Sequence, residues 1–218
     1  MTEVAIVTGG AGGIGGAIVR RLAADGLTVV AADLEAALAG APGEPGVVPA
    51  AVDVGDAASV DALVATAVSH GTLRAVVNCA GVLRHTKVGE MTDDDIEASL
   101  SVNVAGAMRV VRAAAPHLGD GAAVVNITSI AGSMGSPVGV AVYASTKAGL
   151  EGYTRAMAIE LAPRNVRVNA IAPGFIDAPM AAGVRAAGDE RIRSLVPLQR
   201  LGQPEEIAEA VAFLVSPR

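Results

Sequence analysis

The sequence has few aromatic residues, few charged residues and one cysteine. It contains no Trp, two Phe and two Tyr, so its core must be built from aliphatic side chains. Charged residues make up 17% of the chain and hydrophobic residues 52%, whereas soluble domains usually carry about 25% charged residues. A disordered chain is therefore excluded. So little charge also means that core packing, a ligand or a partner subunit covers much of the surface.

Other absences exclude whole classes of function. The formal net charge is −6 with no basic stripe, and the few aromatics could not stack bases, so no nucleic-acid partner is expected. Charged residues such as Asp33 and Arg109 interrupt the apolar stretches before they reach the ~18 residues of a membrane span. Residues 1–8 predict a strand rather than a signal peptide. No two histidines have metal-ligand spacing, and a single Cys79 excludes an intrachain disulfide, so we expect no metal site and a reducing, cytoplasmic setting.

The pattern along the chain predicts an α/β fold. Short β-branched runs that are almost entirely apolar alternate with Ala-rich helical stretches, which is typical of strands buried on both faces of a parallel sheet. Strands are expected at 4–8, 27–33, 47–53, 74–78, 122–128 and 166–172, and helices at 13–25, 57–69, 93–118, 143–162 and 204–215. We therefore predict a doubly wound, Rossmann-type parallel sheet in a single domain, 1–218, with a partly helical substrate lid at about 175–202.

A glycine-rich loop follows the first expected strand and precedes the first helix. Glycines there allow a tight turn and a close backbone approach to a pyrophosphate at the helix N-terminus. The string fits two patterns, Gly10-x-Gly12-x-x-Gly15 and Thr8-Gly9-x-x-x-Gly13-x-Gly15. Because the strand and helix flank it as required, the loop predicts dinucleotide binding rather than a structural turn.

Two acidic residues end the next expected strands. Asp33 can accept hydrogen bonds from the adenosine ribose hydroxyls, and its charge would repel a 2′-phosphate, so NAD is favoured over NADP. Neither the glycine loop nor residues 34–37 contain an Arg or Lys to reverse that preference. Asp53 could contact the adenine amino group, although a role in helix entry is nearly as plausible from sequence.

Four polar residues are candidates for acid/base chemistry on a carbonyl or hydroxyl group. Tyr143 and Lys147 are one helical turn apart and face the same side, so the lysine ammonium can lower the pKa of the phenol. Ser129 ends the fifth expected strand and could hold a carbonyl oxygen, and Asn103 could hold a water for proton relay. All four are expected beyond the carboxyl edge of the sheet, where open α/β sheets bind ligands.

These motifs, in this order, resemble the short-chain dehydrogenases/reductases in their compact single-domain branch. The resemblance covers nearly the whole chain. Thr8-Gly9-x-x-x-Gly13-x-Gly15 resembles the family's cofactor loop, Asn78-Cys79-Ala80-Gly81 its Asn-Asn-Ala-Gly motif, and Pro173-Gly174 its turn beside the nicotinamide. Asn103, Ser129, Tyr143 and Lys147 match its catalytic tetrad.

The family implies specific roles for these residues. Tyr143 would be the acid/base, Ser129 would orient the substrate oxygen, Lys147 would assist Tyr143 and bind ribose, and Asn103 would support the relay. A homodimer or homotetramer is also implied. The implied contacts with the NAD cofactor are Gly9, Gly13, Ile14, Gly15, Asp33, Asp53, Val54, Asn78, Ala80, Gly81, Tyr143, Lys147, Pro173, Gly174 and Ile176.

The sequence departs from the family pattern at four points. Gly12 stands where NADP-preferring relatives often carry Arg, which favours NAD. Ser129 and Tyr143 are one position further apart than is common, and Ala178 replaces an expected hydroxyl. The chain also ends just after the last helix, so we expect it to lack the family's seventh strand, which leaves an exposed sheet edge or marks a chain shortened from a longer parent.

The expected substrate is apolar. The apolar side chains of the substrate loop and lid predict a pocket for an acyl chain, a steroid or another hydrophobic secondary alcohol or ketone, and the segment 197–207 resembles 3-oxoacyl-thioester reductases. These side chains are Met134, Val138, Val140, Val142, Phe175 and Met180. Two alternatives remain: a sugar-nucleotide epimerase, for which the chain leaves no room for a second domain, and a non-catalytic dinucleotide sensor or scaffold, which would be expected to lose part of the tetrad.

Overall fold

A computed structural model describes residues 2–39, 44–135, 139–182, 186 and 188–217, apart from the side chains of 189, 191 and 192. A six-stranded, wholly parallel sheet in the order β3-β2-β1-β4-β5-β6 forms its centre. The strands are β1 (Glu3–Thr8), β2 (Thr28–Asp33), β3 (Val47–Ala51), β4 (Thr72–Asn78), β5 (Ala123–Ile127) and β6 (Arg167–Ile171).

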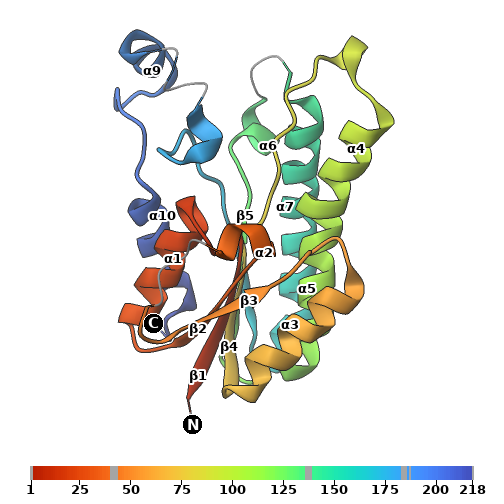
Figure 1. Cartoon of the computed structure of the whole chain (residues 1–218), viewed down its shortest axis with the longest axis vertical. Coiled ribbons are helices and arrows are strands. Elements are labelled where there is room, and N and C mark those ends of the chain that lie inside the picture. The colour runs from red at the N-terminus through yellow and green to blue at the C-terminus, as the bar shows by residue number, and fades with distance from the viewer. Residues whose placement is uncertain (1, 40–43, 136–138, 183–185, 187, 218) are drawn as a thin grey trace.

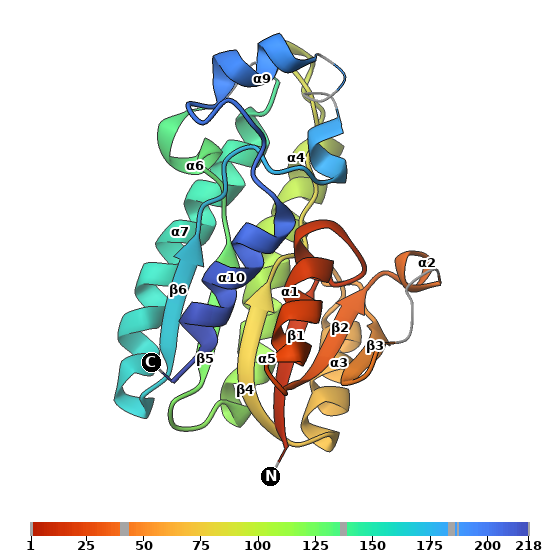
Figure 2. The same cartoon turned by 90° about the vertical axis from the view of Figure 1, so that its left-hand side faces the viewer.

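Helices cover both faces of the sheet, as Figures 1 and 2 show. One face carries α1 (Gly13–Ala24) and α10 (Pro204–Val215). The other carries α3 (Ala57–Ser69), α5 (Ala107–Ala114) and α7 (Ala141–Leu161). The shorter helices are α2 (Glu35–Leu38), α4 (Asp93–Leu100), α6 (Ala131–Met134) and α9 (Asp189–Leu195). The predicted doubly wound α/β fold is confirmed.

The apolar runs are continuous because each strand faces two cores. In β1, Val4 and Ile6 pack with α3 and α5, whereas Ala5 and Val7 pack with α1 and α10. Successive side chains of a strand point to opposite faces, so both sets must be apolar when both faces are covered. The core is aliphatic, as the lack of aromatics predicts.

Capping residues determine where two helices begin. The side chain of Thr92 accepts a hydrogen bond from the amide of Asp95, whose carboxylate binds the Thr92 amide in return, which is the predicted capping box. Pro204 occupies the first turn of α10, and Gln203 and Glu206 form a second capping box before it.

The structure departs from the predicted elements in three places. The single helix expected at 93–118 is instead α4, a π-helical segment (Ser101–Gly106), α5 and a 3-10 turn (Ala115–His117). β3 ends at Ala51, before Asp53. The short helix α2 was not predicted. In the part of the chain that the structure describes, β6 pairs with β5 alone, so its outer edge is open as expected.

The segment after β6 lies beyond the carboxyl ends of the strands (Figure 2). It contains a 3-10 turn (Pro179–Ala181) and α9, and a single bridge joins Ile176 to Gly202. Among the described residues between β6 and α10 there are helical turns and no strand, and the role of this segment as a substrate lid stays a prediction. Among the described residues, no helix is long and apolar enough to cross a membrane.

Candidate active site

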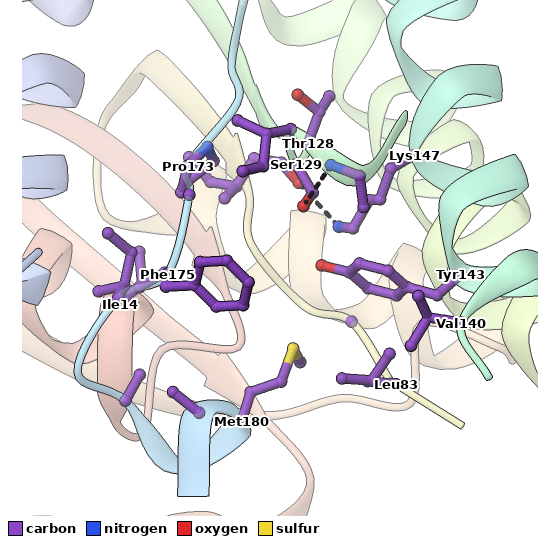
Figure 3. A pocket seen from close by; sticks show the side chains of 18 of the residues that line it. Ile14, Leu83, Thr128, Ser129, Val140, Tyr143, Lys147, Pro173, Phe175 and Met180 are labelled. Atoms are coloured by element: carbon purple, nitrogen blue, oxygen red, sulfur yellow. Dashed lines mark hydrogen bonds between the residues drawn. The ribbon is translucent and has the colours of Figure 1, made fainter. Parts of the chain in front are cut away.

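A cavity of about 410 Å³ opens at the carboxyl ends of β4, β5 and β6. Figure 3 shows the Tyr143 hydroxyl pointing into it, with Phe175 across the cavity. Its walls are largely apolar, and their polar side chains include those of Ser129, Tyr143 and Lys147 as well as Thr128 and His85. The lining residues are Ile14, Cys79, Gly81, Leu83, His85, Ile127, Thr128, Ser129, Ile130, Ala131, Gly135, Val140, Tyr143, Lys147, Pro173, Gly174, Phe175, Ile176, Ala178, Met180, Ala181 and Leu195.

Tyr143 and Lys147 project from the first turns of α7. The Lys147 side chain is buried, with 4% of its surface exposed. Its Nζ donates to the carbonyl of Ile127 at 2.8 Å, which anchors the ammonium at the end of β5. Tyr143 and Lys147 are one helical turn apart, as the sequence predicts, and both side chains therefore reach the same cavity.

Burial controls the ionisation of these groups. Burial lowers the pKa of Lys147 from 10.5 to about 8, with Cys79 opposing the shift. Burial also raises the pKa of Tyr143 above 10.0, and a hydrogen bond with Ser129 opposes this. Lys147 is not among the groups that shift the pKa of Tyr143 here, so a lowering of that pKa by Lys147 together with a positively charged nicotinamide stays a prediction. Burial likewise raises the pKa of the Cys79 thiol to about 11.

Ser129 lies two residues after the end of β5, and hydrogen bonds of the following turn hold it in place. Its Oγ accepts a hydrogen bond from the amide of Ala131 at 3.2 Å. The next amide, of Ile130, donates to the carbonyl of Pro173 at 3.1 Å, and the Thr128 hydroxyl donates to Ile171 at 3.0 Å. These bonds tie the ends of β5 and β6 together, so Ser129 and the Pro173-Gly174 turn lie on the same cavity wall.

Asn103 lies behind the cavity, in the π-helical segment, and is 1% exposed. Its Oδ1 accepts from the amide of Val82 at 2.8 Å, and its Nδ2 donates to the Val82 carbonyl at 2.9 Å. Nδ2 also donates to Thr146 Oγ1 at 3.0 Å. The side chain predicted to hold a relay water is thus bonded mainly to protein groups. π-Helical turns inside helices often occur at functional sites.

The glycine loop forms a cradle that fits a phosphate. Gly9 and Gly13 have φ values of 69° and 55°, which favour glycine. A Cβ on Gly15 would lie 1.9 Å from the Gly9 carbonyl oxygen. Gly12 caps α1 with no side-chain hydrogen bond, and the first turn contains no acidic residue, so the helix N-terminus can receive an anion.

Asp33 supports the loop from the end of β2. Its Oδ2 accepts from the amide of Ala11 at 3.0 Å and its Oδ1 from the amide of Leu34 at 2.8 Å. The carboxylate is thus fixed beside the cradle, where the sequence predicts it. Asp53 is exposed, and its Oδ1 accepts from the Gly55 amide at 2.7 Å, which makes it part of a turn after β3.

Two of the predicted cofactor residues have side chains turned into the protein. Val54 is buried and packs against Gly106. Asn78 is buried, and its Nδ2 donates to Asn126 Oδ1 at 2.8 Å across β4 and β5. In this structure the side chains of both residues therefore contact protein groups. Ala80 is closer to the loop, because its amide donates to Thr8 Oγ1 at 3.2 Å.

The sequence identified part of the cavity lining. Of the six apolar side chains predicted for the pocket, Val140, Phe175 and Met180 line the cavity. Val142 and Met134 are not among the lining residues, Met134 being 80% exposed, and Val138 lies outside the described residues. Leu83 and Leu195 line it as well, and no motif indicates them. Thr146 could have been noticed as a polar residue between Tyr143 and Lys147. Among the described residues, no three His, Cys, Asp or Glu are grouped as a metal site would require.

Comparisons with known proteins identify the family of this chain. The family model described as enoyl-(acyl carrier protein) reductase matches residues 9–218. A short-chain dehydrogenase from Burkholderia cenocepacia, solved in complex with NADP, is 37% identical with a TM-score of 0.88, covering 98% of this chain and 90% of that one. The chain belongs to the short-chain dehydrogenase/reductase family.

The names of two curated relatives indicate the reactions that similar short-chain dehydrogenases/reductases catalyse. The 3-oxoacyl-(acyl-carrier-protein) reductase FabG of Thermotoga maritima is 37% identical, covering 98% of this chain and 90% of the relative. The (3R)-3-hydroxyacyl-CoA dehydrogenase of Mus musculus is 36% identical, covering 99% and 90%. The chain is thus an oxidoreductase for hydroxyl or keto groups that uses a nicotinamide dinucleotide, and its glycine cradle and Asp33 fit that cofactor.

Proposed function

We propose that this short-chain dehydrogenase/reductase interconverts an apolar secondary alcohol and its ketone with NAD(H). The observation that carries the proposal is that Ser129, Tyr143 and Lys147 converge on one cavity whose walls are largely apolar. The alcohol or carbonyl group would meet these three residues while its carbon chain contacts Leu83, Phe175 and the neighbouring apolar side chains.

Each polar residue of the cavity has its own role in the proposed reaction. A bound nicotinamide supplies or accepts the hydride. In reduction, Tyr143 donates its hydroxyl proton to the carbonyl oxygen, and in oxidation it takes that proton back. Ser129 donates a hydrogen bond to the same oxygen and so polarises the carbonyl. The raised pKa of Tyr143 keeps the phenol protonated, which suits the acid needed in reduction.

Lys147 and Asn103 support Tyr143. The Lys147 ammonium, fixed by Ile127, stabilises negative charge on the Tyr143 oxygen and can bind the nicotinamide ribose. Asn103 holds the segment behind both residues and supports proton relay from there.

We favour NAD over NADP because of Asp33. Its carboxylate is fixed beside the cradle by the Ala11 and Leu34 amides, where it can accept bonds from ribose hydroxyls and would repel a 2′-phosphate. Neither the loop nor residues 34–37 offer a cation in its place. We propose that the adenine meets Asp53 and the Val54 main chain, and that the nicotinamide end meets residues that line the cavity, namely Ile14, Gly81, Pro173, Gly174 and Ile176.

The proposed substrate class is a 3-oxoacyl or 3-hydroxyacyl thioester, with steroid-like compounds second. The names of the two curated relatives support the thioester, and the apolar walls support either. Within the single domain 1–218, we assign the segment 175–202 as a substrate lid, because Phe175, Met180 and Leu195 line the cavity from it.

We further propose a homodimer or homotetramer in the cytoplasm. Three exposed large apolar side chains, Leu100, Met108 and Ile159, lie on α4, α5 and α7, and a partner subunit would cover them. The single free thiol, Cys79, fits a reducing compartment. Sedimentation velocity would measure the assembly directly.

An absorbance assay at the NADH band tests the function. The panel holds 3-oxoacyl thioesters of increasing chain length, steroid ketones and short polar ketones, each with NADH and with NADPH. We expect turnover that increases with apolar chain length and is faster with NADH. NADH binding without turnover across the panel would contradict catalysis and favour the non-catalytic sensor.

A further inference from the structure

Thr146 occupies a junction between the catalytic helix turn and the segment behind the cavity. It lies between Tyr143 and Lys147 on α7 and is 1% exposed. Its hydroxyl donates to the Tyr143 carbonyl at 2.7 Å and accepts from Asn103 Nδ2 at 3.0 Å. The Thr146 hydroxyl therefore donates its hydrogen bond within α7 and accepts one from Asn103 in the π-helical segment.

Asn103 carries this connection to the cavity wall. Besides Thr146, its amide binds both main-chain groups of Val82, and the neighbouring residues Gly81 and Leu83 line the cavity. A Cβ on Gly81 would lie 3.3 Å from Asn103 Oδ1 and 3.5 Å from Lys147 Nζ. The wall, the Asn103 amide and the Lys147 ammonium are thus packed closely, and Thr146 joins them to α7.

We propose that Thr146 is a positioning residue, whose hydroxyl holds the 81–83 wall at a fixed distance from Tyr143 and Lys147 through the Asn103 amide. Without that acceptor, one N–H of the buried Asn103 amide has no partner, and a buried unpaired donor drives the side chain to shift. The wall bonded to Asn103 shifts with it. Because proton and hydride transfer need tight geometry, a small displacement lowers the rate far more than it weakens substrate binding.

The same helix contains a matched control. Thr154 is also buried, donates to the Leu150 carbonyl at 2.7 Å and accepts from Asn126 Nδ2 at 2.8 Å. It therefore repeats the bonding of Thr146, two turns further along α7, but Asn126 lies within β5 and Thr154 does not line the cavity. Thr154→Val removes the same groups from α7 without touching the 81–83 wall.

Steady-state kinetics give the first test, and this part rests on the proposed function. Thr146→Val, which keeps the shape and loses the hydroxyl, should lower kcat about 10- to 100-fold with KM changed by less than about threefold. Thr146→Ser, which restores the hydroxyl, should recover kcat to within about threefold of the parent. Thr154→Val should lower the melting temperature and leave kcat within about twofold of the parent.

Hydrogen exchange gives a second test that needs no activity. The Val82 amide donates to Asn103, so it should exchange about tenfold faster or more in Thr146→Val than in the parent, Thr146→Ser or Thr154→Val. If the parent turns over no substrate, the proposed function fails and Val82 exchange alone decides the role of Thr146.

Three outcomes would overturn the proposal. These are parental kcat in Thr146→Val, a Thr146→Ser enzyme as slow as Thr146→Val, and unchanged exchange at Val82. If Thr146→Val does not fold, Thr146→Ala and Thr146→Ser, which differ only in the hydroxyl, replace it with the same expectations.

Discussion

The Lys147 Nζ lies 5.6 Å from the centroid of the Tyr143 ring, over its face. The ammonium is held there by the Ile127 carbonyl rather than by the phenol oxygen. A cation over an aromatic ring is attracted by the ring as a whole, so the contact does not depend on the hydroxyl. The ring and the hydroxyl of Tyr143 can therefore be separated by mutation.

Tyr143→Phe removes the hydroxyl and keeps the ring beneath Lys147. Because it removes the proposed proton donor, kcat should fall at least about 10³-fold, whereas NADH binding, measured by fluorescence titration, should stay within about threefold of the parent. The only other tyrosine, Tyr153, lies on the same helix outside the cavity, and Tyr153→Phe should keep the parental kcat. A Tyr143→Phe enzyme with near-parental turnover would show that another group transfers the proton.

Asp33→Ala tests the cofactor preference. Removing the fixed carboxylate should weaken NADH binding and relieve the repulsion of a 2′-phosphate, so the ratio of NADPH to NADH dissociation constants should fall about tenfold. Asp53→Ala is the control, because the adenine amino group is common to both dinucleotides and the ratio should not change. Tighter binding of NADPH than NADH by the parent would contradict the role given to Asp33.

Two glycines of the loop differ in what a side chain would meet. A Cβ on Gly15 would lie 1.9 Å from the Gly9 carbonyl oxygen, whereas a Cβ on Gly12 has nothing within 4 Å, and Gly12 has an extended φ of −172°. Gly15→Ala should therefore lower the free energy of unfolding by about 1–3 kcal/mol and abolish NADH binding. Gly12→Ala should change stability by less than about 0.5 kcal/mol. Urea denaturation measures both, and equal losses would show that the loop is not closely packed.

The sequence predicted the fold well because local and long-range signals agree. The strands are apolar throughout since helices cover both faces, and Thr92 and Pro204 begin helices as their chemistry requires. The position of the Tyr143–Lys147 pair followed from helical periodicity alone. Each of these features leaves a pattern within a short segment of the chain, so it can be read from the sequence.

What the sequence did not predict depends on contacts between distant segments. The helical pattern of the sequence did not reveal the π-helical turn around Asn103. The Asn103 side chain bonds to Val82 and Thr146, which lie on other segments of the chain. The raised pKa of Tyr143 follows from burial, which residue spacing does not reveal. For the same reason, the inward side chains of Val54 and Asn78 could not be told from ligand contacts.

The buried Lys147 should make stability depend on pH in a defined direction. Burial lowers its pKa from 10.5 to about 8, so between these values the unfolded chain binds more protons than the folded one, and stability rises with pH. Lys147→Met fills similar space without the charge. From pH 7 to pH 9, the free energy of unfolding of the parent should therefore rise by about 1 kcal/mol relative to Lys147→Met.

The ionisable groups facing Lys147 are Tyr143 on its own helix and Cys79 after β4. The raised pKa of Cys79 acts with the opposite sign, because its unfolded thiol ionises first, but mainly between pH 9 and about 11. Both proteins contain Cys79, so its contribution largely cancels in the difference, and pH 9 is the upper limit of the comparison. Urea denaturation of both proteins at several pH values between 7 and 9 measures the effect. A difference that does not change with pH would mean that Lys147 keeps an ordinary pKa and that water reaches its ammonium.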